Sequence, residues 1–279
     1  RQGRFGTFSS VRGQEASVVG AAMALDPARD WLVPQYRELP ALLRHGYPME
    51  HFALYFMGNP RGGAIPAEVN MLPLQISLAA QVPQATGLAW GLRLQGSDGV
   101  VVTFFGDGAS NQGTVLESMN LAAIWNLPVI FVVENNGYAE STSIDYALAV
   151  DSYIDRAAGF GIPGVTVDGT DFFAVYEAAG EIIKRAREGG GPAFLECKMV
   201  RFFGHFEGDA QTYRAKGENE ENRANKDCLK IFRSKVTKAG VISDAELNKI
   251  DDQVLARIEA SVQKAKGDPL PTAKDLLTD

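Results

Sequence analysis

Two apolar runs joined by a helical segment predict an open, mostly parallel α/β sheet with helices on both faces. Residues 99–105 and 129–135 are rich in β-branched and aromatic side chains without polar alternation, which is typical of strands buried on both faces. A helix predicted over 114–126 lies between them, so the two strands pair in parallel through a right-handed crossover. A further helix over 171–188 precedes a third strand at 193–200.

The segment before this unit is predicted from its small, apolar and helix-breaking residues. We expect a buried helix over 13–25, a pair of short helices within 26–63, an irregular stretch over 64–80 and a helix over 83–94. Gly87 and Gly91 lie one turn apart in this last helix, and glycines at such positions favour close packing against another backbone.

The C-terminal part of the chain is more polar. The segment 209–225 predicts a mobile loop, and periodic apolar residues over 247–262 predict a surface helix. We therefore expect one α/β domain over residues 1–240 and a helical extension of the same domain over 241–279.

Composition and charge argue against several classes of protein. The 279 residues carry a formal charge of −7 and a pI near 5.1, which argues against nucleic acid or an anionic membrane as the partner. No apolar run reaches the roughly 20 residues of a membrane-spanning helix. Cys197 and Cys228 are too few for a disulfide framework and indicate a reducing compartment. The chain opens without an initiator Met, which is compatible with the removal of a targeting peptide.

Polar residues follow two of the predicted strands at the point where each strand ends. Asp107 follows the first strand and Asn136 the second, and parallel pairing brings those ends to one edge of the sheet. A carboxylate and an amide oxygen are hard ligands that suit Mg²⁺ or Ca²⁺ better than zinc. Gly106 and Gly108 let the turn bring backbone N–H groups to an anion, and the next helix directs its positive end there. These residues predict a metal-diphosphate site.

Each of these turns also has a plainer interpretation. Residues 106–108 and 135–137, taken singly, are more typical of tight turns than of ligand sites. Their occurrence at the ends of two buried strands of one unit favours the site. The sequence lacks GxGxxG after a strand and lacks GxxxxGK[ST], so dinucleotide-binding and P-loop interpretations are without their anchor motifs.

The segment 106–139 resembles a known cofactor motif. It runs GDGASNQGTVLESMNLAAIWNLPVIFVVENNGYA and is similar to the thiamine-diphosphate motif, which begins GDG and ends NN. In detail it resembles the alpha subunits of pyruvate, acetoin and branched-chain 2-oxo acid dehydrogenases. The resemblance continues through RQGRFG, GQEAS, PQYRELP, NMLPLQISLAAQVPQATG, GIPGVTVDGTD, GPAFLECK and RFFGHFEGD. The middle third and GHFEGD are most similar to acetoin dehydrogenases, and the first hundred residues to pyruvate dehydrogenases of Gram-positive bacteria.

The resemblance implies thiamine diphosphate and Mg²⁺ as cofactors and assigns the metal ligands. Asp107 and Asn136 would bind Mg²⁺ through their side chains. The backbone carbonyl of Tyr138 would be the third ligand from the protein.

The same resemblance implies the residues that contact the diphosphate. Gly106 belongs to the turn, and the N–H groups of Gly108 and Ala109 would face the diphosphate. Tyr36 and Arg37, within PQYRELP, match the family's Tyr-Arg pair, and arginine suits that role through its planar fork of donors. Without the resemblance, Arg37 would be interpreted as a solvated surface charge.

Three further residues are assigned to the reacting part of the cofactor. His205 matches the family's active-site loop histidine, although a single histidine in a loop is more typically a surface residue. Leu78 falls where the family places a bulky residue beneath the bent cofactor, and Ile76 would offer backbone contact to its aminopyrimidine. Plain core packing explains Leu78 and Ile76 nearly as well.

The resemblance also implies a reaction and partners. The reaction is oxidative decarboxylation of a 2-oxo acid, with transfer of the acyl unit to a lipoyl group on a second enzyme. In this family the glutamate that protonates the aminopyrimidine belongs to a beta subunit, and neither Glu15, Glu117 nor Glu134 matches it by motif. We therefore expect an inactive lone chain that needs a beta partner, in a heterotetramer of two alpha and two beta chains. The helices over 83–94 and 114–126 are candidate interface elements, with core packing an equal alternative.

Three departures from the family pattern limit what can be carried over. GNPRGGAIPAEVN replaces the family's glycine-rich GKGGSMH stretch, and the printed sequence does not include the family's usual N-terminal helical arm. Phe206 and Glu207 stand where mitochondrial relatives have a regulatory serine, which favours a prokaryotic, cytoplasmic enzyme over one in the mitochondrial matrix.

The substrate and the class of protein leave alternatives open. Pyruvate is the first choice because of the N-terminal third, with acetoin and branched-chain 2-oxo acids close behind. A transketolase or decarboxylase with the same motif normally needs a much longer chain. Outside this cofactor, a Mg²⁺-dependent phosphatase would need a nucleophilic Asp or a Lys-bearing loop, neither of which we find. A non-catalytic scaffold is disfavoured by the presence of Asp107, Asn136 and His205.

Overall fold

A five-stranded parallel sheet forms the centre of the molecule, which confirms the predicted fold class. The computed structural model describes residue 6 and residues 8–277, and its strands follow the order β1-β2-β3-β7-β6. These strands are β1 (Trp31–Val33), β2 (Val101–Gly106), β3 (Val129–Asn135), β6 (Gly164–Asp168) and β7 (Ala193–Lys198). Each neighbouring pair is parallel. A short antiparallel hairpin, formed by β4 (Tyr138–Ala139) and β5 (Thr142–Ser143), follows β3.

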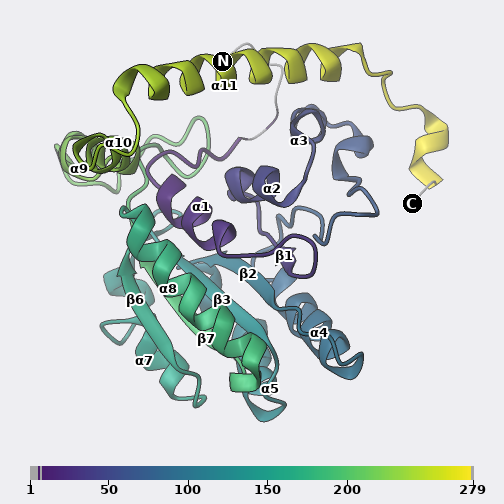
Figure 1. The fold of residues 1–279 in the computed structure, drawn as a ribbon, viewed down its shortest axis with the longest axis vertical. Helices are drawn as coiled ribbons and strands as arrows, with labels where there is room; N and C mark the ends of the chain where they lie inside the picture. Colours follow the sequence, from purple (N-terminus) through teal and green to yellow (C-terminus); the bar gives the residue numbers. More distant parts are fainter. Residues whose placement is uncertain (1–5, 7, 278–279) are drawn as a thin grey trace.

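Helices cover both faces of the sheet (Figure 1). On one face α1 (Glu15–Met23), α2 (Leu39–His45) and α8 (Phe172–Arg185) pack with Val102, Phe104, Ile130 and Val132. On the other face α4 (Gln81–Leu94), α5 (Gly113–Ile124) and α7 (Tyr153–Ala158) pack with Val101, Phe105, Phe131 and Val133. Because successive strand residues point to opposite faces, a sheet covered on both sides requires the uninterrupted apolar runs of β2 and β3.

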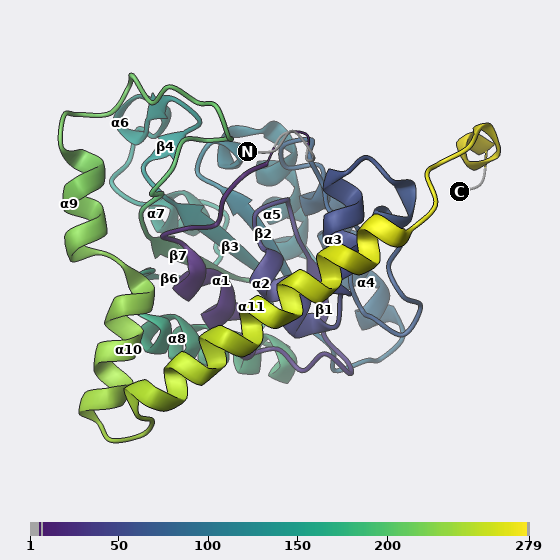
Figure 2. The same cartoon turned by 90° about the horizontal axis from the view of Figure 1, so that it is seen from above.

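Helices of the C-terminal third lie outside these layers. They are α9 (Glu218–Asn225), α10 (Cys228–Lys238) and α11 (Asp244–Gly267), followed by the 3₁₀ turn Ala273–Leu277. α11 crosses the molecule from α10 to α3 (Met49–Phe56), as Figures 1 and 2 show. Ser243 begins α11 with a capping box, in which the Ser243 hydroxyl accepts from the Glu246 N–H and the Glu246 carboxylate accepts from the Ser243 N–H. Across residues 8–277, no helix has both the length and the apolar character needed to span a bilayer.

Two parts of the fold differ from what the sequence predicts. They are the outer strands of the sheet, which were not predicted, and the polar segment 209–225. β1 has three residues, too few to show a period, and β6 alternates because it is an outer strand with one side exposed. The segment 209–225 contains α9, so the prediction of a mobile loop throughout it is wrong. None of the α9 residues is buried, and the helix therefore carries no apolar period that could reveal it.

The two glycines of α4 face open space. A Cβ added at Gly87 or at Gly91 would meet no atom within 4 Å, so the close packing expected there is not made within the described chain. Trp90 of α4 lies close to Trp125, with ring centroids 4.8 Å apart and ring planes inclined by 38°. Contact of this face with a partner chain stays a prediction.

Two threonines of the sheet, the buried Thr103 and the exposed Thr166, give opposite expectations for stability. Thr103 in β2 is fully buried, and its hydroxyl has no hydrogen-bond partner among the described residues. Thr103→Val should raise the free energy of unfolding by about 1 kcal/mol because it removes an unsatisfied polar group. Thr166 is the matched control: its hydroxyl donates to the buried Glu196 carboxylate at 2.9 Å, so Thr166→Val should lower that free energy by about the same amount. Urea unfolding measures both, and destabilisation by Thr103→Val would contradict the account.

Candidate cofactor site at the carboxyl ends of the strands

The register of β2 and β3 brings the two predicted metal ligands to the same edge of the sheet. Gly106 lies opposite Glu134, so Asp107 and Asn136 both emerge just beyond the strand ends. Asp107 is buried, and its Oδ1 accepts the Gly108 N–H at 2.8 Å. Its Oδ2 is buried without a partner in the described part of the chain. An unpaired buried carboxylate oxygen is costly, and a bound cation would satisfy it.

Burial raises the pKa of Asp107 to about 6. The hydrogen bond from the Gly108 N–H, the Arg201 charge and the nearby backbone N–H groups of Tyr138 and Gly137 oppose that rise. The carboxylate therefore lies within reach of the turn that carries Asn136 and Tyr138, as the sequence predicts.

Of the two glycines of the first turn, only Gly108 is required by the packing around it. A Cβ at Gly108 would lie 2.7 Å from the Cβ of Ala139, so the turn after β2 packs directly on the β4 strand. A Cβ at Gly106 would meet nothing within 4 Å, which leaves open space above the strand end. Ala109 begins a 3₁₀ turn, Ala109–Asn111, and α5 starts only at Gly113. α5 thus begins within one residue of the predicted helix over 114–126, and one short turn separates it from Gly108.

Three residues that the sequence did not single out hold this turn. The hydroxyls of Ser110 and Tyr153 donate to the Asp107 carbonyl at 2.6 and 3.1 Å. Arg156 donates to the Ser110 carbonyl at 2.9 Å. Tyr153 and Arg156 both belong to α7, so this helix stabilises the turn that follows β2.

The second turn offers oxygen ligands. Asn136 Oδ1 accepts the Tyr138 N–H at 3.3 Å, and Asn136 Nδ2 donates to Gln14 Oε1 at 2.9 Å. Gly137, which lies between Asn136 and Tyr138, has φ +85°, a left-handed backbone conformation that favours glycine. In the described ranges, no three His, Cys, Asp or Glu side chains gather to hold a metal. A carboxylate, an amide oxygen and a carbonyl form a donor set that fits Mg²⁺ completed by phosphate and water.

Tyr36, Arg37 and His205 form a second group beside these turns. Arg37 donates to the carbonyl of His205 at 2.8 Å and to its Nδ1 at 3.3 Å, while the Tyr36 hydroxyl lies 3.5 Å from Nε2. Arg37 is buried, so the interpretation of a solvated surface charge is wrong. Glu38 holds the turn, because its carboxylate accepts the N–H groups of Gln35 and Arg37 at 3.1 and 3.0 Å.

The imidazole of His205 is neutral near pH 7. Its pKa is lowered to about 4 by burial and by the positive charges of Arg37 and Arg201, which together outweigh the opposing charge of Asp209. Arg37 and Arg201 both lie within hydrogen-bond reach of Nδ1, at 3.3 and 3.4 Å. Since guanidinium groups only donate, Nδ1 is the acceptor and the single ring proton resides on Nε2. Nε2 is also the nitrogen that faces Tyr36.

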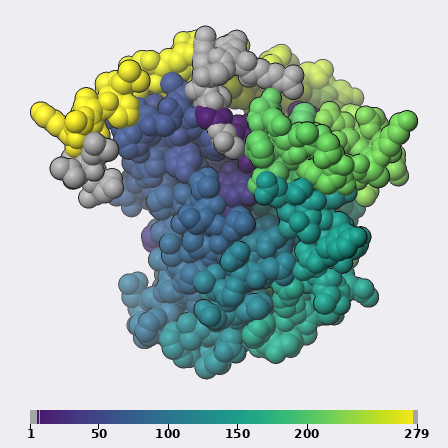
Figure 3. All heavy atoms as spheres, turned by 180° about the vertical axis from the view of Figure 1, so that it is seen from behind, coloured from purple at the N-terminus to yellow at the C-terminus, as the bar shows by residue number. Residues whose placement is uncertain are grey.

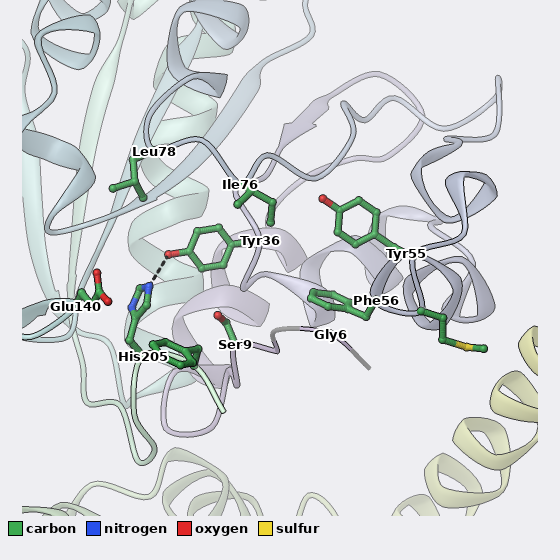
Figure 4. Close-up of a pocket in the computed structure, with 12 residues that line it drawn as sticks. Gly6, Ser9, Tyr36, Tyr55, Phe56, Ile76, Leu78, Glu140 and His205 are labelled. Carbon is green, nitrogen blue, oxygen red and sulfur yellow. Dashed lines mark hydrogen bonds between the residues drawn. The ribbon is translucent and has the colours of Figure 1, made fainter. Parts of the chain in front are cut away.

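Ile76 and Leu78 line an open pocket with Tyr36 and His205 (Figure 4). Their exposed fractions are 55% and 49%, so the alternative of plain core packing is wrong for both. The Gln75 N–H donates to the Gln35 carbonyl at 2.7 Å and ties this segment to the turn of Tyr36. The pocket has a volume of about 740 Å³ and is mainly apolar in its lining. In Figure 3 the molecule is hollowed between the segments coloured blue and green, with N-terminal residues recessed between them.

Arg201 joins the two groups and was not predicted from the sequence. Its side chain is fully buried and donates to the Glu140 carbonyl at 2.9 Å and to the Tyr213 hydroxyl at 2.7 Å. It contacts His205 and acts electrostatically on Asp107. The available signal was its place in RFFGHFEGD, four residues before His205.

Comparison with known proteins places the chain in a family. The sequence profile described as dehydrogenase E1 component matches residues 1–274. Over 224 residues the chain is 69% identical to the alpha subunit of acetoin:2,6-dichlorophenolindophenol oxidoreductase from Cupriavidus necator, covering 79% of this chain and 67% of that protein. The Bacillus subtilis protein of the same name is 50% identical over 198 residues, 70% of this chain and 58% of that protein.

A pyruvate-type relative matches along almost the entire chain at lower identity. The alpha subunit of the Bacillus subtilis pyruvate dehydrogenase E1 component is 38% identical over 279 residues, which are 99% of this chain and 75% of that protein. The matched part is thus between 58% and 75% of the length of these relatives, less than two thirds for one of the acetoin-type proteins. The profile match and these identities confirm the resemblance seen in the sequence. The chain belongs to the dehydrogenase E1 component family, as an alpha-type chain of the thiamine-diphosphate-dependent 2-oxo acid dehydrogenases.

Proposed function

We propose that this chain is the cofactor-anchoring alpha subunit of an acetoin-cleaving dehydrogenase. The observation that carries the proposal is the meeting, at one edge of the sheet, of the Asp107–Asn136 turns with the Tyr36–Arg37–His205 group. An oxygen donor set for Mg²⁺, a buried arginine and an apolar pocket are what a metal-bound diphosphate with an organic reacting end would need.

The residues divide this work between them. Asp107, Asn136 and the Tyr138 carbonyl would hold Mg²⁺, and the cation would satisfy the unpaired, buried Oδ2 of Asp107. The turn at Gly106, with the N–H groups of Gly108 and Ala109, would face the diphosphate. Tyr36 and Arg37 would contact the same diphosphate. Thiamine diphosphate, when bound, supplies the carbanion chemistry that cleaves a bond beside a carbonyl group.

His205, Ile76 and Leu78 act on the reacting end of the site. Ile76 and Leu78 present an apolar surface that supports the cofactor and excludes water. His205 presents a neutral Nε2–H, a hydrogen-bond donor that can orient a substrate oxygen without placing a positive charge in the pocket.

The pocket favours a neutral hydroxyketone over an anionic 2-oxo acid. Among the described residues that line it, the charged side chain is Glu140, and no lysine or arginine contributes to the lining. A negative group repels the carboxylate of pyruvate but can accept the hydroxyl proton of acetoin. The higher identity to acetoin-type relatives supports the same choice. Pyruvate, the first choice from the N-terminal third of the sequence, becomes the second candidate substrate.

The rest of the active centre comes from partner chains. Alpha-type chains act with a beta subunit, and we propose a heterotetramer of two alpha and two beta chains that passes the acyl unit to a lipoyl-bearing acyltransferase. The open face of α4 at Gly87 and Gly91 supports an additional chain at that surface, since a neighbouring backbone can approach glycines closely.

Substrate profiling tests the proposed function. The complex with its beta chain should cleave acetoin with a kcat/KM at least roughly tenfold above that for pyruvate, a difference of about 1.4 kcal/mol in transition-state binding. Reduction of 2,6-dichlorophenolindophenol follows the reaction, and the alpha chain without its partner serves as the blank. Higher kcat/KM for pyruvate would assign the chain to the pyruvate type instead.

The lowered pKa of His205 predicts how stability depends on pH. As pH falls from about 6.5 to about 4, the unfolded chain binds a proton at this histidine and the folded chain does not, so stability is lost over that window. His205→Gln removes this loss and should gain stability relative to the unaltered chain near pH 5 but not near pH 7.5. Urea unfolding at both pH values measures the difference, with His51→Gln as the control for exchanging a histidine. Parallel pH dependences for His205→Gln and the unaltered chain would contradict the assignment.

A further inference from the structure

We propose that Gln14 is a positioning residue that fixes the orientation of the Asn136 amide, so that its oxygen faces the metal. The inference rests on the proposed function, because it concerns how the metal ligand is held. Asn136 Nδ2 donates to Gln14 Oε1 at 2.9 Å, across the gap between the β3 end and the start of α1.

The two contacts of Asn136 together determine which way its amide points. The Tyr138 N–H can only donate, so the atom facing it, at 3.3 Å, is Oδ1. Nδ2 must then face an acceptor, and Gln14 Oε1 supplies it. If the amide turned by half a rotation, its NH₂ group would replace the oxygen, and an NH₂ group cannot bind a cation.

The backbone on both sides of Gln14 is tightly constrained. Gln14 itself is fully buried. Gly13 has φ +96°, and a Cβ there would lie 2.5 Å from the Val200 carbonyl oxygen. The Glu15 carboxylate accepts the Gly13 N–H at 2.8 Å and closes this turn. A side chain that starts from such a turn has little freedom to move away from Asn136.

α1 is held in place by packing farther along the helix. The Ser17 hydroxyl donates to the Gly169 carbonyl at 2.7 Å in a buried position. A Cβ at Gly20 would lie 2.9 Å from Val175 of α8, so the two helices are in close contact. The position of Gln14 relative to β3 is therefore set by the core.

The orientation of Gln14 leaves one of its own atoms unsatisfied. Its Nε2 is buried without a partner among residues 8–277, an arrangement that costs stability. Turning the Gln14 amide would bring NH₂ against NH₂ at Asn136. The observed pairing thus gives Asn136 its acceptor at the expense of a buried donor on Gln14. Groups behind a metal ligand commonly work in this way, by orienting the ligand rather than touching the metal.

The test measures metal affinity directly. Mn²⁺ serves as the probe for the Mg²⁺ site, in the assembled alpha–beta complex with saturating thiamine diphosphate, and the EPR signal of free Mn²⁺ gives the dissociation constant. Gln14→Met, which keeps the length of the side chain but removes the acceptor, should weaken Mn²⁺ binding roughly 10- to 100-fold. Gln14→Asn, which stays polar and withdraws the acceptor by one methylene, should change affinity in the same direction. Gln253→Met on the exposed surface of α11 is the matched control and should not change it.

A double-mutant cycle separates positioning from a general structural effect. In Asn136→Asp both side-chain atoms are oxygens, so orientation no longer matters. Adding Gln14→Met to this background should then change the Mn²⁺ dissociation constant by no more than about twofold. A merely structural role for Gln14 would weaken binding equally in both backgrounds.

The outcomes distinguish a failure of the positioning role of Gln14 from a failure of the proposed function. If the unaltered complex binds Mn²⁺ with thiamine diphosphate and Gln14→Met and Gln14→Asn bind it equally well, the positioning role is overturned and the proposed function stands. If the losses are equal with Asn136 and with Asp at that position, the positioning role is also overturned. If the unaltered complex binds no Mn²⁺ in the presence of thiamine diphosphate, the proposed function fails and this inference fails with it.

Discussion

The parallel pairing of β2 and β3 is the constraint on which the rest of the site depends. Their register places Gly106 opposite Glu134, so the chain leaves both strands at the same level and delivers Asp107 and Asn136 to one edge. Shifting the register by one residue would exchange the two faces of β3, so that each of its side chains would have to pack against the helices of the opposite layer. The same core packing that stabilises the sheet therefore fixes the distance between the two turns.

The electrostatics of the site follow from the burial of charged side chains of both signs close to one another. Asp107 lies beneath the surface with one oxygen unpaired, while Arg37 and Arg201 converge on His205 a short distance away. Two buried guanidinium groups are costly unless anions or carbonyls face them. In the described chain they donate to backbone carbonyls and to His205, and the anionic diphosphate we propose would add the missing negative charge. The neutral His205 follows from the same positive surroundings.

The sequence predicts the central fold well and the edges poorly, for physical reasons. β2, β3 and β7 are buried on both faces and show it in their composition, whereas β1 is too short and α9 too polar to carry a pattern. Asp107, Asn136, Tyr36, Arg37 and His205 were predicted, and the structure brings them together. Arg201, Gln14 and the α7 residues that brace the loop act through contacts between segments distant in sequence, which no local pattern encodes. Ile76 and Leu78 were assigned from the resemblance, and only their exposure in the structure rules out plain core packing.

Calorimetric titration of thiamine diphosphate with Mg²⁺ into the alpha–beta complex tests the central claim most directly. Asp107→Ala removes the carboxylate at the end of β2, and Asp252→Ala on the exposed surface of α11 is its control. The account predicts saturable binding that requires Mg²⁺, is retained in Asp252→Ala and is lost in Asp107→Ala. Binding of undiminished affinity in Asp107→Ala, or no binding by the folded unaltered complex, would contradict it.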